Sequence, residues 1–367
     1  MSQIRIATMI GTRPEIIRLS ETIKRLDASP NIQHTLIHTG QNYDYELNQI
    51  FFDDLNLRAP NVYLEAAAST PSATIGQVLI KLDEWLAKNP IDAFLVLGDT
   101  NSALGAIAAK KRKIPVFHCE AGNRSFDERV PEETNRRIVD HFADINLPYS
   151  THAKNYLLLE GLPEDKIVLS GSPMKEVLQA NESKIEHSTI LSTLNLEVKK
   201  FFLVSAHREE NVSTLTELLK ITNTLNQLAN QFQYPIIVST HPRTKKELDK
   251  AGVQLNSLIQ LLKPLNYSDY IKLQLNAYCV LSDSGTISEE CAILGFPAVN
   301  IRYSQERPEA FEIGVLPLVG LEYNDVLKGI ELVTNRLDAP PIPVDYQSSD
   351  FSKRVIKTIL SYIENNA

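Results

Sequence analysis

Short apolar runs alternate with amphipathic segments along almost the whole chain. In the first half, the apolar runs predict strands at 4–10, 34–38, 93–97, 115–119, 144–147 and 167–170. Segments with a helical period lie between them, at 14–27, 43–55, 73–88, 101–112, 132–142 and 151–160. Apolar strands that alternate with helices indicate βαβ units and a parallel sheet that helices cover on both faces.

The same pattern starts a second time, after Gly171-Ser172-Pro173 and a looser stretch that ends near residue 200. Strands are predicted at 201–206, 235–239, 258–262, 278–282, 297–301 and 315–319. Helices are predicted at 213–231, 243–251, 267–276, 286–294 and 323–336, and a proline-rich stretch precedes a last helix at 350–364. The second half therefore predicts another doubly wound sheet.

We predict an α/β protein of two Rossmann-like, doubly wound parallel-sheet domains that face a central cleft. Residues 1–172 form the N-terminal domain and residues 173–349 the C-terminal domain, and the segment 350–367 packs back on the first domain. Open parallel sheets bind ligands beyond the carboxyl ends of their strands, so chemistry is expected in the strand-to-helix loops.

Composition narrows the class of protein. The 367-residue chain has a formal net charge of −8, which argues against nucleic acid and anionic membrane surfaces as partners. Its three cysteines lack paired spacing and fit a reducing compartment. The chain opens in a strand-like run and no apolar stretch approaches ~20 residues, so we expect a cytoplasmic protein. The usual NAD fingerprint, the P-loop and the common metal-binding motifs are absent, so we expect no metal, no NAD and no other cofactor.

Charged side chains follow the strands of the first half. Arg13 lies in a Gly-Thr-Arg-Pro-Glu turn, where it and the backbone amides either hold a phosphate oxygen or form a plain turn. Asp99 and Glu120 follow two later strands, Arg124 comes shortly after, and Glu132 begins a helix. Asp99 can equally cap the next helix. Three carboxylates at one sheet edge nevertheless indicate acid and base chemistry, which needs carboxyl groups in unlike environments.

The loops of the second half carry phosphate-binding candidates. His207 and His241 end two strands, where a histidine either contacts phosphate, moves a proton or is simply buried and hydrogen-bonded. Glu290 lies one turn into the predicted helix 286–294 and can hold a ribose diol, whereas Glu289 of the same helix is expected to face solvent. Arg307, expected to begin a later helix, adds a cation. A turn of small residues at a helix N-terminus is suited to a diphosphate: Ser284, Gly285 and Thr286.

These segments occur in an order that resembles one enzyme family. GTRPE, GDT, EAG, PEE, HREEN, DSG and ERPEA follow one another from residue 11 to residue 310. Together they resemble the non-hydrolysing UDP-N-acetylglucosamine 2-epimerases, over nearly the whole chain. The segments 38–47, 120–129 and 282–288 are most similar to one branch, the UDP-N-acetyl-L-fucosamine synthases. Members that act on the glucosamine sugar usually carry Lys at the position of Arg18, Leu-Arg-Thr-Gly after EAG, and DSGG in place of DSGT.

The resemblance implies a GT-B-like fold, a homodimer, and UDP bound mainly by the C-terminal domain. It implies inversion at carbon 2 of UDP-2-acetamido-2,6-dideoxy-L-talose, which gives UDP-N-acetyl-L-fucosamine for capsule or O-antigen synthesis. UDP would leave and re-add within the site. Proton transfer would fall to Asp99, Glu120 and Glu132, with no assignment of acid and base. The remaining site residues would bind substrate or stabilise the leaving UDP: Arg13, Arg18, Arg124, His207, His241, Ser284, Gly285, Thr286, Glu290 and Arg307.

Other functions stay open from the sequence. A UDP-N-acetylglucosamine 2-epimerase would use the same residues on a different sugar. A GT-B glycosyltransferase would share the fold and the UDP pocket. A hydrolysing relative and a catalytically silent nucleotide-sugar sensor are further alternatives.

Overall fold

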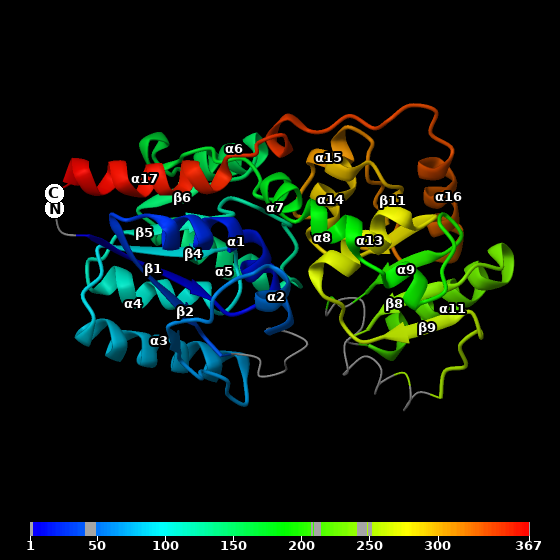
Figure 1. Ribbon diagram of the computed structural model, residues 1–367, viewed down its shortest axis with the longest axis horizontal. Coiled ribbons are helices and arrows are strands. Elements are labelled where there is room, and N and C mark those ends of the chain that lie inside the picture. The colour runs from blue at the N-terminus through cyan, green and yellow to red at the C-terminus, as the bar shows by residue number, and fades with distance from the viewer. Residues whose placement is uncertain are drawn as a thin grey trace. The chain divides into compact units, whose positions relative to one another are not determined.

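A computed structural model describes residues 3–40, 49–206, 208, 214–240, 248 and 252–366. The chain divides into two compact units (Figure 1). Unit 1 comprises Met1–Ala180 and Val344–Ala367, and unit 2 comprises Asn181–Pro343. The chain thus leaves unit 1 once and returns to it at the C-terminal end.

Unit 1 contains a parallel sheet with the strand order β3-β2-β1-β4-β5-β6. Apolar residues fill its central strands on both faces, as a sheet between two helical layers requires. The strand order reverses direction between β1 and β4, so the loops after these strands flank the crevice where such sheets bind ligands. The strands are β1 (Ile4–Ile10), β2 (Ile32–His38), β3 (Val62–Tyr63), β4 (Ala93–Leu97), β5 (Val116–Cys119) and β6 (Ile145–Leu147).

Helices cover both faces of this sheet. On one face, side chains of β1, β4 and β5 share a buried core with α3, α4 and α5. On the other face, α1 packs against α7 and α17, and Figure 1 shows the red α17 beside α1 and β6. The ring of Phe117 in β5 meets that of Tyr362 in α17 at 5.5 Å. The helices are α1 (Arg13–Ala28), α2 (Gln49–Asp54), α3 (Pro71–Lys88), the 3₁₀ turn η2 (Ala103–Gly105), α4 (Ala106–Lys111), α5 (Pro131–Phe142), α6 (Thr151–Leu159), the 3₁₀ turn η3 (Glu164–Lys166), α7 (Met174–Ala180), the 3₁₀ turn η4 (Val344–Tyr346) and α17 (Phe351–Asn366).

Unit 2 contains a second parallel sheet with the strand order β11-β10-β7-β8-β9. Here the order reverses between β7 and β10. The two doubly wound parallel sheets confirm the predicted fold class. The strands are β7 (Phe202–Ser205), β8 (Ile236–Ser239), β9 (Ile259–Leu262), β10 (Cys279–Ser282) and β11 (Ala298–Asn300), and the helices are α8 (Glu182–His187), α9 (Ile190–Thr193), α11 (Leu215–Phe232), α13 (Tyr267–Asn276), α14 (Ile287–Leu294), α15 (Glu309–Glu312) and α16 (Tyr323–Thr334).

Some predicted elements are wrong. The segments 167–170 and 315–319 are not strands, because each makes only an isolated bridge, Asn146 to Ile167 and Asn300 to Leu318. The helix expected at 101–112 begins as a 3₁₀ turn and becomes α-helical only at Ala106. The helix expected at 243–251 lies almost wholly outside the described residues, and 43–55 is described only from residue 49. In the part of the chain that the structure covers, every helix is too short or too polar to cross a bilayer.

Candidate active site

Asp99 lies just beyond the carboxyl end of β4, at the crevice of unit 1. Gly98 before it has φ +69°, and its amide donates to the carbonyl of Cys119, which ties the ends of β4 and β5 together. The Asp99 carboxylate accepts two hydrogen bonds from Arg136 of α5, one of them from Nε at 3.0 Å. Asn135 of the same helix donates to the Asp99 carbonyl at 2.9 Å. Asp99 is therefore held by α5 and does not cap the following helix.

Glu120 lies at the end of the neighbouring strand β5. It is a non-glycine residue at φ +64°, a left-handed conformation that costs about 1–3 kcal/mol and clusters at functional sites. Its Oε2 lies 3.4 Å from Nε of Arg18 in α1. The Arg18 guanidinium also lies over the ring of Tyr149, 5.5 Å from its centre, and its side chain is 1% exposed. The sequence placed Arg18 in the site, and the structure joins it to one of the predicted carboxylates.

Glu132 and Glu133 occupy the first turn of α5 and differ in burial. Glu132 is half-buried, whereas Glu133 is buried beside Arg136, whose Nη1 lies 2.7 Å from its Oε2. Burial acts to raise the pKa of Glu133, but hydrogen bonds from Ser125 and the Arg136 charge bring it below its ordinary value. Glu133 is therefore an ionised anchor for Arg136, a role that sequence reasoning missed.

Glu15 is a second residue that sequence reasoning missed. Its buried carboxylate accepts hydrogen bonds from the amides of Gly11 at 2.6 Å and Thr12 at 2.7 Å, and from the Thr100 hydroxyl at 2.6 Å. These contacts join the loop of Arg13 to the loop of Asp99. For these two amides they favour the plain turn over the phosphate-binding alternative, because Gly11 and Thr12 already donate to Glu15. The Arg13 guanidinium lies 5.9 Å from the centre of the Phe51 ring.

Arg124 takes a different place from the one expected of a substrate ligand. Its side chain is fully buried, and Nη1 lies 2.7 Å from Oδ2 of Asp140. Nε and Nη2 donate to Glu160 at 2.7 and 2.5 Å, and Nη1 also donates to the Asn123 carbonyl at 2.7 Å. The donors of its guanidinium are thus engaged with protein groups, and we infer a structural role for Arg124.

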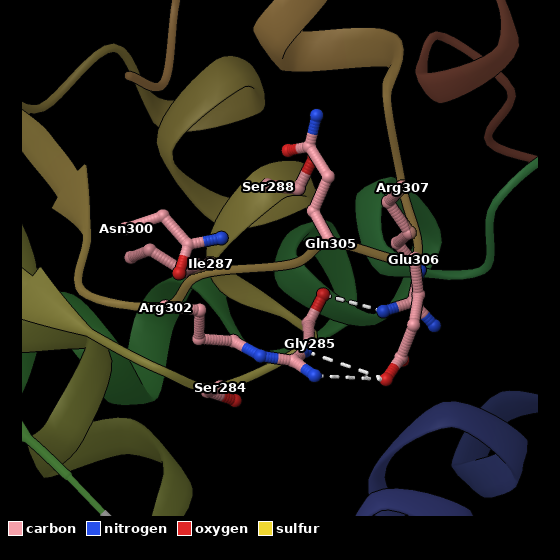
Figure 2. Close-up of a pocket in the computed structure, with 9 residues that line it drawn as sticks. All are labelled: Ser284, Gly285, Ile287, Ser288, Asn300, Arg302, Gln305, Glu306 and Arg307. Carbon is pink, nitrogen blue, oxygen red and sulfur yellow. Dashed lines mark hydrogen bonds and ion pairs between the residues drawn. The ribbon is translucent and has the colours of Figure 1, made fainter. Parts of the chain in front are cut away.

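Unit 2 contains a small pocket of about 240 Å³ empty volume between the turn after β10 and the segment that follows β11. Figure 2 shows how its charged side chains converge on Gly285. Arg307 donates to the Gly285 carbonyl, and Arg302 lies with Nη1 and Nη2 at 3.3 Å from Glu306. Nη1 of Arg208, at the end of β7, is 3.6 Å from the same Glu306 oxygen. The lining residues are Ser284, Gly285, Ile287, Ser288, Asn300, Arg302, Gln305, Glu306 and Arg307.

Gly285 has a steric reason to be glycine. A Cβ atom there would lie 2.8 Å from Nη1 of Arg307 and 3.4 Å from Nη2 of Arg208. Ser284 and Thr286 on either side hydrogen-bond each other through their hydroxyls at 3.0 Å, just before α14 begins. Arginines beside a helix N-terminus make a site suited to a phosphate group.

The two glutamates of α14 are both buried. Glu289, expected to face solvent, is 0% exposed and lies 3.6 Å from Nε of Arg307. The expectation was wrong because Arg307, from a segment after β11, covers this side of the helix. Glu290 accepts a hydrogen bond from Gln274 at 2.7 Å. Arg307 itself precedes the short helix α15 and does not begin it.

His207 and His241 lie outside the described residues, so their predicted roles rest on the sequence. Burial raises the pKa of the three cysteine thiols, Cys119, Cys279 and Cys291, which leaves them protonated at neutral pH. Among the described residues, no group of three or more His, Cys, Asp or Glu side chains is arranged to hold a metal ion.

The chain is similar to characterised proteins along nearly its whole length. It matches the family model of UDP-N-acetylglucosamine 2-epimerase over residues 24–360. The structure of UDP-N-acetylglucosamine 2-epimerase from Rickettsia bellii matches it with a TM-score of 0.91 at 45% identity, covering 99% of this chain and 98% of that chain. UDP-GlcNAc 2-epimerase from Methanocaldococcus jannaschii, in complex with UDP-GlcNAc and UDP, matches with a TM-score of 0.91 at 35% identity, covering 98% and 100%.

A relative with a different named substrate matches nearly as fully. UDP-2,3-diacetamido-2,3-dideoxy-D-glucuronate 2-epimerase of Pseudomonas aeruginosa is 32% identical over 320 residues, which cover 86% of this chain and 88% of that protein. The family model spans most of the chain, and the solved relatives share both doubly wound units of the GT-B-like fold. The chain therefore belongs to the UDP-N-acetylglucosamine 2-epimerase family and is an isomerase of that family.

Proposed function

We propose that the protein inverts carbon 2 of a UDP-linked 2-acetamido sugar by eliminating UDP and adding it back. Family membership supports this activity. The observation that carries it is the pair of carboxylates at the ends of neighbouring strands: Asp99 after β4 and Glu120 after β5, each contacting a buried arginine. Two carboxyl groups at the ends of neighbouring strands can act as base and acid on one substrate.

The chemistry explains why these groups are needed. The carbon-2 proton is not next to a carbonyl, so its direct removal is difficult. When a base takes that proton while the bond from carbon 1 to the UDP oxygen breaks, a 2-acetamidoglycal-type alkene and UDP remain. UDP then adds to carbon 1, and a proton returns to carbon 2 from the other face. The route neither oxidises nor reduces the sugar, so it needs no redox cofactor, and it needs no metal in principle.

Each part of this route has candidate residues. Asp99, Glu120 and Glu132 would transfer protons, and a well-placed group of this kind contributes roughly 10²–10⁴-fold to the rate. Arg13 and His207 would stabilise the departing UDP. In unit 2, the turn of Ser284, Gly285 and Thr286 with Arg307 would bind the diphosphate, Glu290 the ribose, and His241 would contribute from its own loop. Arg18 would orient Glu120.

The sugar is the finer part of the proposal. The residues around Glu120, the DSGT turn and Arg18 are most similar to the fucosamine-synthase branch, and they favour UDP-2-acetamido-2,6-dideoxy-L-talose as the substrate. Family membership supports UDP-N-acetylglucosamine equally well, and this sugar appears in the names of the Rickettsia bellii and Methanocaldococcus jannaschii relatives. The proposal places the enzyme in the cytoplasm as a homodimer that feeds capsule or O-antigen synthesis. A GT-B glycosyltransferase is the alternative from another class.

Proton NMR in deuterated water tests the reaction, with the two UDP sugars supplied separately. Conversion of the talo compound, with deuterium entering at carbon 2, is the expected result. Conversion of UDP-N-acetylglucosamine alone would change the assigned substrate but support the proposed reaction. If the folded, UDP-binding protein leaves both sugars unchanged, epimerisation of these two sugars is excluded, and a transferase gains support.

Single substitutions test which carboxylates transfer protons. Asp99→Asn and Glu120→Gln should each lower turnover by roughly 10²-fold or more, because one proton-transfer group is lost. Asp83→Asn is the matched control, since Asp83 is an exposed carboxylate of unit 1 that pairs with Arg112 at 2.6 Å. Full activity of both site variants would contradict the assignment of these carboxylates, whatever the sugar.

A further inference from the structure

A buried charged cluster lies directly behind the ends of β4 and β5. It consists of His118, Arg124, Asp140 and Glu160, which come from β5, the following loop, α5 and the end of α6. The side chains of the first three are 0% exposed, and that of Glu160 is 25% exposed. The chemistry proposed above uses none of them. Their contacts, however, reach the backbone of both loops that carry the candidate carboxylates.

His118 contacts the loop of Asp99. Its Nε2 lies 2.7 Å from the carbonyl oxygen of Gly98, the residue immediately before Asp99. A carbonyl oxygen can only accept, so Nε2 carries a proton. Its Nδ1 lies 3.0 Å from Oδ1 of Asp140. One buried ring therefore contacts both the loop of Asp99 and a carboxylate of α5.

Asp140 contacts the loop of Glu120. Both of its oxygens lie 3.2 Å from the amide nitrogen of Gly122, two residues after Glu120. Gly122 has little freedom to move, because it has φ +81° and a Cβ there would lie 2.3 Å from the carbonyl oxygen of Ala153. The Gly122 amide that donates to Asp140 is thus packed closely against α6.

Arg124 holds Asp140 from another side. Its guanidinium lies 2.7 Å from Asp140 and 2.5 Å from Glu160, so Asp140 has both Arg124 and His118 as neighbours. Removing one partner of a buried ion pair is strongly unfavourable, so the Asp140 carboxylate has little freedom to leave this place.

We propose that His118 and Asp140 are positioning residues, which hold the Asp99 and Glu120 loops in the mutual arrangement needed for proton transfer. The pair touches the residue before Asp99 and the second residue after Glu120, so a shift in the pair moves both loops. The inference rests on the proposed epimerase chemistry. Misplacing a reacting group by about 1 Å can lower a rate by roughly 10²-fold, so the pair acts on turnover more than on binding.

Two variants separate the contacts of His118. In His118→Gln, the side-chain amide can reach the place of Nε2 and still donate to Gly98, but the contact with Asp140 is lost. In His118→Asn, the shorter amide can reach Asp140, but the hydrogen bond to Gly98 is lost. His141→Gln is the matched control, because His141 is an exposed neighbour of Asp140 on α5 whose Nδ1 lies 2.8 Å from the Arg137 carbonyl.

The expected result separates turnover from binding and folding. Both His118 variants should lower kcat by roughly ten- to a hundredfold, with KM and the Kd of UDP within about twofold of the wild-type values and urea unfolding still cooperative. His141→Gln should match the wild type. If kcat per folded molecule is unchanged in both His118 variants and only the urea midpoint falls, the residue is merely structural and the inference is overturned.

A measurement that needs no substrate distinguishes failure of this inference from failure of the proposed function. Nitrogen-15 NMR of the histidine rings at pH 7 should show a proton on Nε2 of His118, and hydrogen exchange at the Gly122 amide should be faster in His118→Gln. A ring without a proton on Nε2, or unchanged exchange at Gly122, would overturn the link from His118 through Asp140. An inactive wild-type protein with both NMR results as expected would instead refute the epimerase chemistry and leave the contact established.

Discussion

Replacing Glu15 by glutamine should make unit 1 more stable at alkaline pH. The Glu15 carboxylate is buried and accepts hydrogen bonds from the amides of Gly11 and Thr12 through one oxygen and from the Thr100 hydroxyl through the other. A glutamine can keep this pattern. Its oxygen would accept from the two amides, and its NH₂ group would donate to the Thr100 hydroxyl, which can also act as an acceptor.

The pKa of Glu15 gives the size and the sign of the effect. Burial raises this pKa from 4.5 to about 7, against the opposing effect of the hydrogen bonds from Thr100, Gly11 and Thr12. Since the folded protein then binds the proton more tightly than the unfolded chain, the stabilisation is complete below pH 4.5 and is lost as pH rises through 7. A difference of about 2.5 in pKa, at about 1.36 kcal/mol for each unit, corresponds to about 3 kcal/mol. Glutamine does not titrate and escapes this loss.

Urea unfolding followed by tryptophan fluorescence measures the effect. The single tryptophan, Trp85, packs against the core of unit 1, so its emission reports on that unit. The free energy of unfolding of wild type minus that of Glu15→Gln should fall by about 3 kcal/mol between pH 4.5 and pH 8.5. Glu164→Gln, at an exposed carboxyl of the same unit, corrects for the change in net charge. A difference that is constant with pH, or that rises with pH, would refute the argument.

Two glycines give further predictions. Gly122→Ala should lower the stability of unit 1 by about 2–4 kcal/mol in urea unfolding, whereas Gly161→Ala should lower it by only about 1–2 kcal/mol. Both glycines have positive φ, but only the Cβ added at Gly122 meets a backbone oxygen, that of Ala153 at 2.3 Å. Equal losses would show that the clash relaxes. Gly285→Ala should weaken UDP binding by about tenfold or more in calorimetry, since its Cβ would displace the Arg307 guanidinium, whose Nη1 lies 2.8 Å away, from the proposed phosphate site. Unchanged UDP affinity would remove Gly285 from the phosphate site.

Long apolar runs made most of the fold predictable. The strands predicted at 4–10 and 93–97 and the helix at 267–276 have the predicted bounds. Buried apolar residues dominate both strands, and the helix buries one face between partly exposed polar residues. The two-residue strand β3 is too short to produce a periodic signal. The short helices between 174 and 193 were missed for a similar reason: each spans seven residues or fewer, and each buries only a few side chains.

The loops that carry the candidate site could be predicted from the sequence, whereas the side chains that contact its residues could not. Strand ends followed by charged residues led to Asp99, Glu120 and Ser284, since the carboxyl ends of parallel strands share one edge. The arginine that binds Asp99 comes from α5, 37 residues later, and no spacing rule connects the two positions. Burial of Glu289 was likewise hidden, because Arg307 reaches it from another segment. Sequence periodicity describes one helix at a time, whereas these contacts depend on how the elements pack.

Buried arginines hold the charged loops of unit 1 that carry Asp99 and Glu120 in place. Arg18, Arg124 and Arg136 are among the largest fully buried side chains, and each contacts a carboxylate from another element. A buried ion pair adds little net stability, because desolvation offsets the attraction, but an incomplete pair is strongly unfavourable. The loops therefore have few alternative conformations in which every charge keeps a partner. The same argument applies to the cluster of His118, in which the loss of one member leaves a buried charge next to the loops of Asp99 and Glu120. Charges that contribute little to the free energy of folding can in this way determine where the two candidate catalytic carboxylates lie.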